Sequence, residues 1–229
     1  MAALSPQERI LRAALTLLEE HGIDAISTRA VSAAADVQPP TIYRHYGDMH
    51  GLLNAVASAG FTTYVHANAA RARHDDPVQE LREGWHLHVD FGLKHPHLYA
   101  LMYRAPETGT LSPAAREAFA ALHALMSRVA GTGRLAISVD RAAAMIHRAG
   151  MGYTMGQLST PEVDRSMSDA MLDAVLNAIL TPDTTTSHRP QEPGAAAHAV
   201  ALAALLPTLE APLSHAERNL LEEWLCRLM

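Results

Sequence analysis

The chain lacks the features of secreted, membrane and disulfide-stabilised proteins. Its 229 residues include one cysteine, Cys226, so no disulfide can form within the chain, which fits a reducing cytoplasm. Its most apolar run, residues 195–206, is shorter than a membrane-spanning helix requires. Polar residues such as Ser5, Glu8 and Arg12 interrupt the N-terminal segment, which therefore does not resemble a signal peptide. We expect a cytoplasmic protein without a membrane partner.

Positive charge is also scarce. The formal net charge is −6, and residues 1–50 carry four arginines against six acidic residues. Between residues 27 and 46, however, Arg29, Arg44 and His45 stand against Asp36 alone. Because a DNA-binding surface needs local rather than overall positive charge, this segment is a candidate for one. The small local excess predicts a low non-specific affinity for DNA.

Catalytic and metal-binding motifs are missing as well. The fourteen histidines include two close pairs, His86 with His88 and His95 with His97. Residues two apart do not share one face of a helix, so neither pair forms a metal site within a regular helix. The sequence has no HExxH motif, no cysteine cluster and no Gly-x-Ser-x-Gly elbow. We therefore expect no enzyme, no metal and no cofactor.

Helical periodicity covers almost the whole chain, and no convincing alternating strand pattern interrupts it. The mean hydropathy of −0.01 and the 48% hydrophobic content are those of an ordinary globular protein. Ser214 and Glu217 form a capping box before the last helix. The sequence predicts an all-α fold. Beyond the first three helices, the predicted helices cover about 51–73, 77–95, 97–105, 112–130, 138–158, 163–180, 195–206 and 214–228.

Three short helices open the chain. A capping box of Ser5 and Glu8 starts the first helix, and Gly22 ends it by accepting a left-handed conformation. The second helix runs from a cap at Ser27 or Thr28 to about residue 35. The residues expected to face inward from the second helix are Ala30, Val31 and Ala34.

A tight turn separates the second helix from the third. Asp36 occupies this turn, where Asp tolerates a positive φ better than most residues. The third helix begins near Pro39, because two prolines are acceptable only in a first turn, and Asp48 caps the helix that follows. Two helices joined in this way form a helix-turn-helix, whose second helix lies in the major groove of DNA.

The side chains around the third helix suit DNA rather than a protein core. Thr28 can bind a phosphate through its hydroxyl and the adjoining helix terminus. Arg44 can donate two hydrogen bonds to a guanine. Tyr43 and His45 are expected to hold phosphates, whereas Ile42 and Tyr46 are expected to pack inside the domain.

At this point the chain resembles the tetracycline-repressor (TetR) family of bacterial transcription regulators. The resemblance covers roughly residues 5–60 and is specific only as an ensemble. The matching residues are Ile10 to Ala14, Gly22, Thr28-Arg29, Ala34 to Val37, Thr41 to Tyr46 and Leu52-Leu53.

The resemblance implies an all-helical homodimer that binds a palindromic operator in double-stranded DNA. Residues 1–50 would form the DNA-binding domain, with residues 27–46 reading the DNA. Residues 51–229 would form a larger helical ligand-binding and dimerisation domain, with a connecting helix at 51–73 and a mobile linker at about 181–194. The predicted DNA-binding residues are Thr28, Arg29, Gln38, Pro39, Pro40, Thr41, Tyr43, Arg44 and His45.

Three residues depart from the family pattern. Asp36 stands where the family usually has Gly, and Gln38 stands where a capping Ser or Thr is common. Met49 replaces the Lys that usually opens the fourth helix and contacts a phosphate. The loss of this cation predicts a shallower dependence of DNA affinity on salt than in a typical relative.

A second resemblance lies further along the chain. Residues 83–91, followed by His95-Pro96 and a Leu-Tyr segment, resemble the ligand domain of one TetR subfamily. Helical spacing also places His147 and Met151 on one face. The residues predicted to line a small-molecule site are Trp85, His88, Phe91, Tyr103, His147 and Met151. For each residue alone, a place in the core is the competing interpretation.

These observations favour a transcription regulator, and most simply a repressor that a small molecule releases from DNA. The family pattern places the dimer contact on two late helices, here 138–158 and 163–180. Residues beyond 194 add either dimer surface or a cover for the ligand site. One alternative is a ligand-binding helical module with weakened or lost DNA binding. The other is an enzyme that uses the His- and Tyr-rich second domain.

Overall fold

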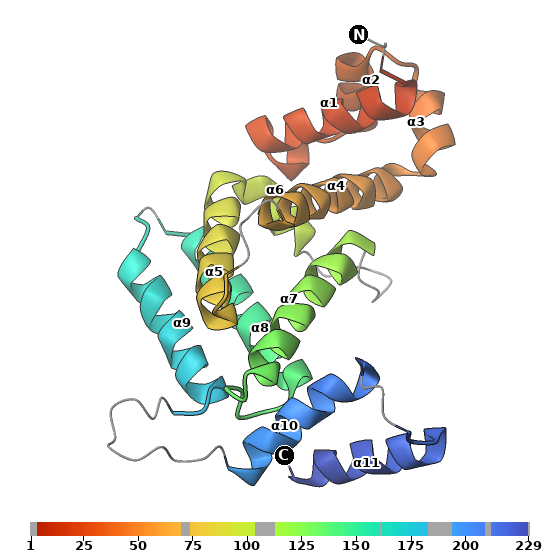
Figure 1. Cartoon of the computed structure of the whole chain (residues 1–229). Coiled ribbons are helices and arrows are strands. Elements are labelled where there is room, and N and C mark those ends of the chain that lie inside the picture. The colour runs from red at the N-terminus through yellow and green to blue at the C-terminus, as the bar shows by residue number, and fades with distance from the viewer. Residues whose placement is uncertain are drawn as a thin grey trace. The chain divides into compact units, whose positions relative to one another are not determined.

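The computed structural model describes residues 4–69, 74–103, 113–160, 162–182, 194–208 and 212–228. Its regular elements there are helices (Figure 1), so the predicted all-α fold is confirmed. The elements are α1 (Pro6–His21), η1 (Ile23–Ala25), α2 (Thr28–Ala35), α3 (Pro39–Tyr46), α4 (Met49–Ala69), α5 (Pro77–Lys94), α6 (Pro96–Met102), α7 (Pro113–Gly131), α8 (Val139–Gln157), α9 (Arg165–Ile179), α10 (Ala195–Leu205), η3 (Leu206–Thr208) and α11 (His215–Leu228).

Local capping signals fix the ends of the first helices as predicted. The Ser5 hydroxyl accepts from the backbone N–H of Glu8, and the Glu8 carboxylate accepts from the backbone N–H of Ser5. Gly22 follows α1 at φ 79°, and Ser27 caps α2 through its side chain. Asp36 takes the left-handed conformation at φ 51°. These caps satisfy helix-terminal backbone groups that otherwise have no partner.

Other expectations need correction or lie beyond the described residues. Ala34 is exposed, whereas Ser32 and Ala35 join Val31 on the buried side of α2. The inward face of α2 is therefore turned by one residue from the predicted face. The last residues of the predicted 51–73 and 97–105 helices, and most of the predicted linker at 181–194, lie outside the described residues. The sequence also did not predict the bridge between Leu135 and Leu180.

The chain divides into two compact units. The first contains residues 1–72, 87–118 and 154–161, and the second contains residues 73–86, 119–153 and 162–229. Helices α5, α7 and α8 therefore contribute residues to both units. The predicted boundary of the DNA-binding domain at residue 50 remains a prediction.

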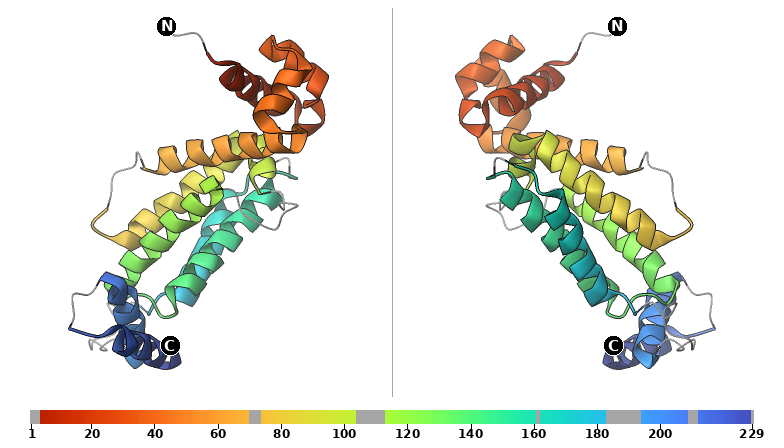
Figure 2. Two further views of the ribbon diagram at one scale, coloured as in Figure 1. Left: turned by 90° about the vertical axis from the view of Figure 1, so that its right-hand side faces the viewer. Right: turned by 90° about the vertical axis from the view of Figure 1, so that its left-hand side faces the viewer.

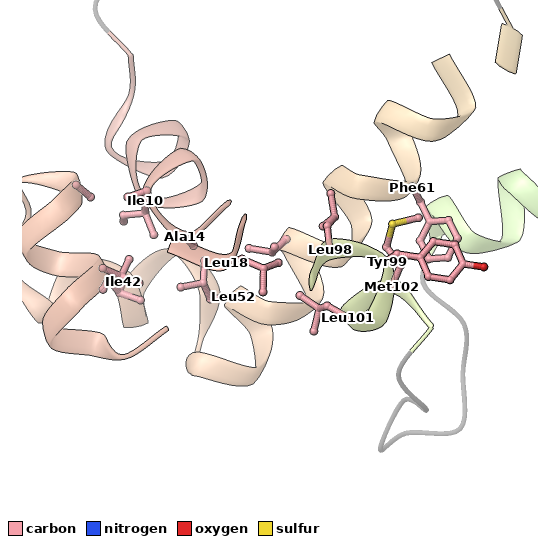
Figure 3. Packing of buried hydrophobic residues seen from close by; sticks show 14 of the residues in the cluster. Ile10, Ala14, Leu18, Ile42, Leu52, Phe61, Leu98, Tyr99, Leu101 and Met102 are labelled. Carbon is pink, nitrogen blue, oxygen red and sulfur yellow. The ribbon is translucent and has the colours of Figure 1, made fainter. Parts of the chain in front are cut away.

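A continuous apolar core holds α1, α3, α4 and α6 together in the first unit (Figure 3). Ile10 and Leu18 of α1, Ile42 of α3 and Leu52 of α4 are fully buried in it. Burying each such side chain stabilises the fold by about 1.5–3 kcal/mol. Because α3 contributes only Ile42 to the buried residues, its other side chains remain at or near the surface.

The second unit has buried apolar residues of its own. They include Met126, Val129, Ala142, Ile146, Leu172, Leu176 and Ile179. Arg128 reaches the Glu80 carboxylate at 2.7 Å. Near the C-terminus, α10 and α11 lie side by side (Figure 2), and the Arg218 guanidinium donates to the carbonyl of Leu206 at 2.5 Å.

Among the described residues, no helix is both long enough and apolar enough to cross a membrane.

Candidate nucleic-acid interface

Helix α3 has one buried side chain and a largely polar exterior. Ile42 is fully buried, whereas Tyr43 is 45% exposed and Arg44 is exposed. Gln38, Pro39 and Pro40 are exposed at the start of the helix, and Thr41 is half-buried. Arg29 of α2 is also exposed. The arrangement leaves a guanidinium, an amide and a phenol accessible on α3 while one apolar anchor holds the helix.

The start of α3 is built from Gln38 and the two prolines. Gln38 is the N-cap in an extended conformation, with φ −79° and ψ 145°. Within the described segment 4–69, its side chain makes no capping hydrogen bond. Pro39 and Pro40 fill the first two helical positions, where a missing N–H costs nothing. The Gln38 amide is therefore not occupied by capping and can reach an outside partner.

A hydrogen bond joins the two helices of the helix-turn-helix at its surface. The Thr28 hydroxyl lies 2.9 Å from the Tyr43 hydroxyl, and either can be the donor. A hydroxyl has one proton and a DNA phosphate only accepts hydrogen bonds, so the hydroxyl that accepts in this pair keeps its proton for a phosphate. The sequence predicted both residues as DNA contacts but not the bond between them, because the bond spans 15 residues and has no local signal.

Two further contacts hold the turn in place. The Tyr46 hydroxyl donates to the carbonyl of Gln7 at 2.8 Å, and burial raises the pKa of this phenol. Tyr46 is therefore a packing residue, as expected. The Arg9 guanidinium donates to the carbonyl of Asp36, the left-handed residue of the turn, at 3.4 Å.

The side chains of His45 and Met49 are partly buried. The Nε2 atom of His45 is buried and has no hydrogen-bond partner among the described residues. Its predicted phosphate contact would therefore need this ring to move or to use its other nitrogen. Met49 packs partly buried against the core of the first unit. This packing gives a physical reason for an apolar residue where the family usually has Lys.

Three of the predicted ligand residues meet in the first unit. The His88 Nε2 atom lies 2.7 Å from the Tyr99 hydroxyl, and the His88 ring also contacts the rings of Tyr64 and Tyr103. Phe91 contacts Tyr64, with ring centroids 5.5 Å apart. Burial raises the pKa values of the Tyr99 and Tyr103 phenols. We call the cluster of Phe61, Tyr64, His88, Phe91, Tyr99 and Tyr103 the aromatic cluster.

Tyr99, like Phe61 and Tyr64, belongs to the aromatic cluster but is not among the ligand residues predicted from the sequence. It is fully buried and four residues before Tyr103, so the two share one face of a helix. That spacing was the signal that could have found it. From this segment, the sequence predicted Tyr103 alone as a ligand residue.

The other three predicted ligand residues belong to the second unit. Trp85 is buried, and its indole N–H donates to the Ser168 hydroxyl at 2.9 Å. The His147 ring contacts Phe119 edge-on, and burial lowers the pKa of this imidazole. Met151 is half-buried. Within the described ranges, no group of three His, Cys, Asp or Glu residues could hold a metal ion.

Comparisons with known proteins agree with this geometry. Residues 10–56 match the family model of the bacterial regulatory proteins of the tetR family. The tetracycline repressor class A of Escherichia coli transposon 1721 is 41% identical over 59 residues, which are 26% of this chain and 27% of that protein. The chain therefore spans about a quarter of the length of this curated relative.

Solved structures resemble the chain over a larger part of its length. A protein of unknown function from Rhodococcus sp. RHA1 covers 78% of this chain and 97% of its own, with a TM-score of 0.65 and 21% identity. RolR in complex with the ligand resorcinol covers 82% of this chain and 96% of its own, with a TM-score of 0.64 and 19% identity. At such identities the likeness concerns the fold.

The fold and the exposed α3 define a helix-turn-helix protein. The helix-turn-helix at residues 10–56 is similar to that of the TetR family of bacterial regulatory proteins. This is a family of transcription regulators and not of enzymes.

Proposed function

We propose that this chain is a TetR-family regulator that binds operator DNA as a homodimer in the cytoplasm and represses transcription until a small molecule releases it. The observation that carries the proposal is the division of α3 between a buried Ile42 and an exposed polar face. A recognition helix needs both, because it must be held firmly while its side chains reach base edges.

Residues of α3 and of the start of α2 make different contacts with DNA. Arg44 donates two hydrogen bonds to the O6 and N7 atoms of a guanine. Of Thr28 and Tyr43, the hydroxyl that accepts in their mutual hydrogen bond donates its own proton to one phosphate, and Arg29 contacts another. The remaining proposed contacts come from Gln38, Pro39, Pro40, Thr41 and His45.

We further propose that the effector is a small molecule bound through the predicted ligand residues of the first unit. The residues are His88, Phe91 and Tyr103, which meet in the aromatic cluster. Rings with a few polar atoms suit a small aromatic molecule that carries hydroxyl groups. A solved structure of similar fold, RolR, holds resorcinol, which has this chemistry.

Helix α4 supplies a physical connection between DNA binding and the effector. Its first half places Leu52 and Val56 in the core shared with α1 and α3. Its second half places Phe61 and Tyr64 against Tyr103 and His88 of the aromatic cluster. A ligand that shifts these rings shifts α4 and with it the helix-turn-helix. Release then follows from the ligand's preference for one of two conformations.

In the proposed dimer, α8 and α9 of each subunit form the contact between subunits. Each subunit then places one α3 in a half-site of a palindrome. The two half-sites would lie about one helical turn, roughly 34–36 Å, apart.

Fluorescence anisotropy of the full chain on the intergenic DNA beside its own gene tests the proposal. We expect saturable binding that weakens as salt rises. Arg44→Ala removes a base contact worth about 1–3 kcal/mol and should weaken binding roughly 5- to 150-fold. Lys94→Ala removes one positive charge from an exposed position of α5, outside the helix-turn-helix and the proposed dimer contact, and serves as the control. The same complex can then be screened for release by hydroxylated aromatic compounds.

The alternative function is a ligand-binding helical module with weakened or lost DNA binding. The inward packing of Met49 and the buried Nε2 of His45 favour it, because both reduce the polar atoms available to phosphates. Binding no tighter than that to random DNA, and equal in wild type and Arg44→Ala, would establish this alternative.

A further inference from the structure

Helix α11 carries an apolar row that is exposed in the described part of the chain. Leu220, Trp224 and Leu228 are 43%, 53% and 59% exposed. They are spaced four residues apart, so they form one stripe along the helix. Tryptophan is enriched at the centres of protein interfaces, and an exposed apolar stripe marks an interaction surface.

A different side of α11 packs within the second unit. Leu225 is buried, and Leu221 and Arg218 are half-buried. At about 100° per residue, these three residues lie on a face turned about 90° from the exposed stripe. The contact between α10 and α11 therefore leaves the stripe uncovered. The neighbouring α10 also leaves Leu202 and Leu205 exposed at 38% and 47%.

We propose that the stripe binds the α11 helix of a second copy of this chain, antiparallel and across a two-fold axis at Trp224. In this register the two Trp224 side chains meet, and each Leu220 faces Leu228 of the other copy. No other antiparallel register superposes the whole stripe on itself. A two-fold contact between identical surfaces is the commonest form of self-association in soluble proteins.

The charges beside the stripe are complementary in this arrangement. Glu223 and Arg227 lie on the same side of the stripe and form an ion pair within the helix. A two-fold axis brings this side of one helix against the same side of the other. Arg227 of each copy then faces position 221 of the other copy, which is two residues along the helix from that copy's Glu223. The two arginines neutralise the two carboxylates, and such a network contributes more than an isolated surface pair.

This contact is separate from the dimer surface proposed on α8 and α9, and it does not depend on DNA binding. Cys226 makes it measurable. It is the chain's only cysteine, it is exposed, and it lies on α11 away from the stripe. A spin label on Cys226 therefore reports the distance between two α11 helices without a further substitution.

Pulsed electron paramagnetic resonance on the labelled full chain tests the proposal. Packed helices lie about 8–10 Å apart, so we expect a defined label-to-label distance under about 30 Å. Trp224→Ala should remove this distance. Asn219→Ala, at an exposed position of the same helix outside the stripe, should keep it. Circular dichroism checks that both variants keep their helices.

A charge-exchange experiment distinguishes contacts between chains from contacts within one chain. Arg227→Glu alone places four carboxylates around the axis, and Glu223→Arg alone places four arginines there. Each variant should lose the short distance. An equal mixture of the two should recover it, because opposite charges then face each other only across the contact. Neither variant keeps the pair within its own helix, so recovery cannot come from there.

Three results would overturn the proposal. The first is the absence of a short distance in the wild type, and the second is its persistence in Trp224→Ala. The third is a mixture of the charge variants that behaves like each variant alone. Binding of the wild type to lipid vesicles, lost in Trp224→Ala and without any short distance, would assign the stripe to a membrane surface instead.

Discussion

Tyr43 of α3 and Tyr99 of α6 have the same side chain in opposite environments. Both hydroxyls form a hydrogen bond to a residue distant in sequence, Tyr43 to Thr28 at 2.9 Å and Tyr99 to His88 at 2.7 Å. Tyr43 is 45% exposed, whereas Tyr99 is fully buried in the aromatic cluster. The residue type therefore does not distinguish an exposed surface from a core, whereas the burial of the side chain does.

The difference follows from how each helix is anchored. In α3 a single aliphatic residue, Ile42, enters the core. In α6, the residues Leu98, Tyr99, Leu101 and Met102 are all buried (Figure 3). A helix held by one residue presents most of its surface to a partner, while a helix buried on several sides contributes mainly to stability. Substitutions should therefore affect DNA binding in α3 and stability in α6.

The largest difference is expected from the same truncation at the two tyrosines. Tyr99→Ala leaves a cavity in the core and should lower the free energy of unfolding by about 3–5 kcal/mol. Tyr43→Ala changes an exposed side chain and should alter stability by about 0.5 kcal/mol or less, while it weakens DNA binding. Denaturant unfolding followed by circular dichroism measures both. Equal losses of stability at the two positions would contradict the comparison.

A smaller effect, of opposite sign at two sites, is expected from adding one methyl group to a helical glycine. A Cβ at Gly92 of α5 would lie 2.3 Å from Cγ2 of Thr154 and 2.9 Å from Cδ2 of Tyr99. Gly92→Ala should therefore destabilise by roughly 1–3 kcal/mol, less the gain in helix propensity. Gly152→Ala of α8 meets nothing within 4 Å among the described residues and should stabilise by up to about 1 kcal/mol. The midpoints of thermal unfolding of the two variants and of wild type measure these changes. A higher midpoint for Gly92→Ala than for wild type would show that the aromatic cluster is loosely packed.

The smallest effect concerns alkaline pH. Burial raises the pKa of Tyr99 above its ordinary value of 10, so the folded chain keeps this phenol protonated where the unfolded chain ionises it. The resulting stability is present below about pH 10 and is lost as the pH rises further. Unfolding midpoints from about pH 8 to about pH 11 should fall more steeply in wild type than in Tyr99→Phe. Parallel curves for the two proteins would place the Tyr99 hydroxyl in contact with water.

The helices could be predicted from the sequence because their signals are local. Ser5, Ser27, Asp36 and Asp48 act within a few residues of their own positions, and each occupies its predicted cap or turn. The predicted buried face of α2 was wrong by one residue, because the hydrophobic pattern of an alanine-rich helix is too weak to show which side is buried.

The contacts of the candidate sites could be predicted less well. The Thr28–Tyr43 and His88–Tyr99 bonds join residues on different helices, and their formation depends on how those helices pack. Met49 was recognised as a departure from the family, but its partly buried place in the core could be seen only in three dimensions.

Selection of bound sequences from a pool of randomised DNA tests the central claim that α3 reads DNA. Wild type and Arg44→Ala are compared under the same salt concentration. The account predicts that wild type enriches an inverted repeat, and that Arg44→Ala loses the preference for guanine at one position of each half-site. Enrichment of no sequence by wild type, or of the same sequence by both proteins, would contradict the account.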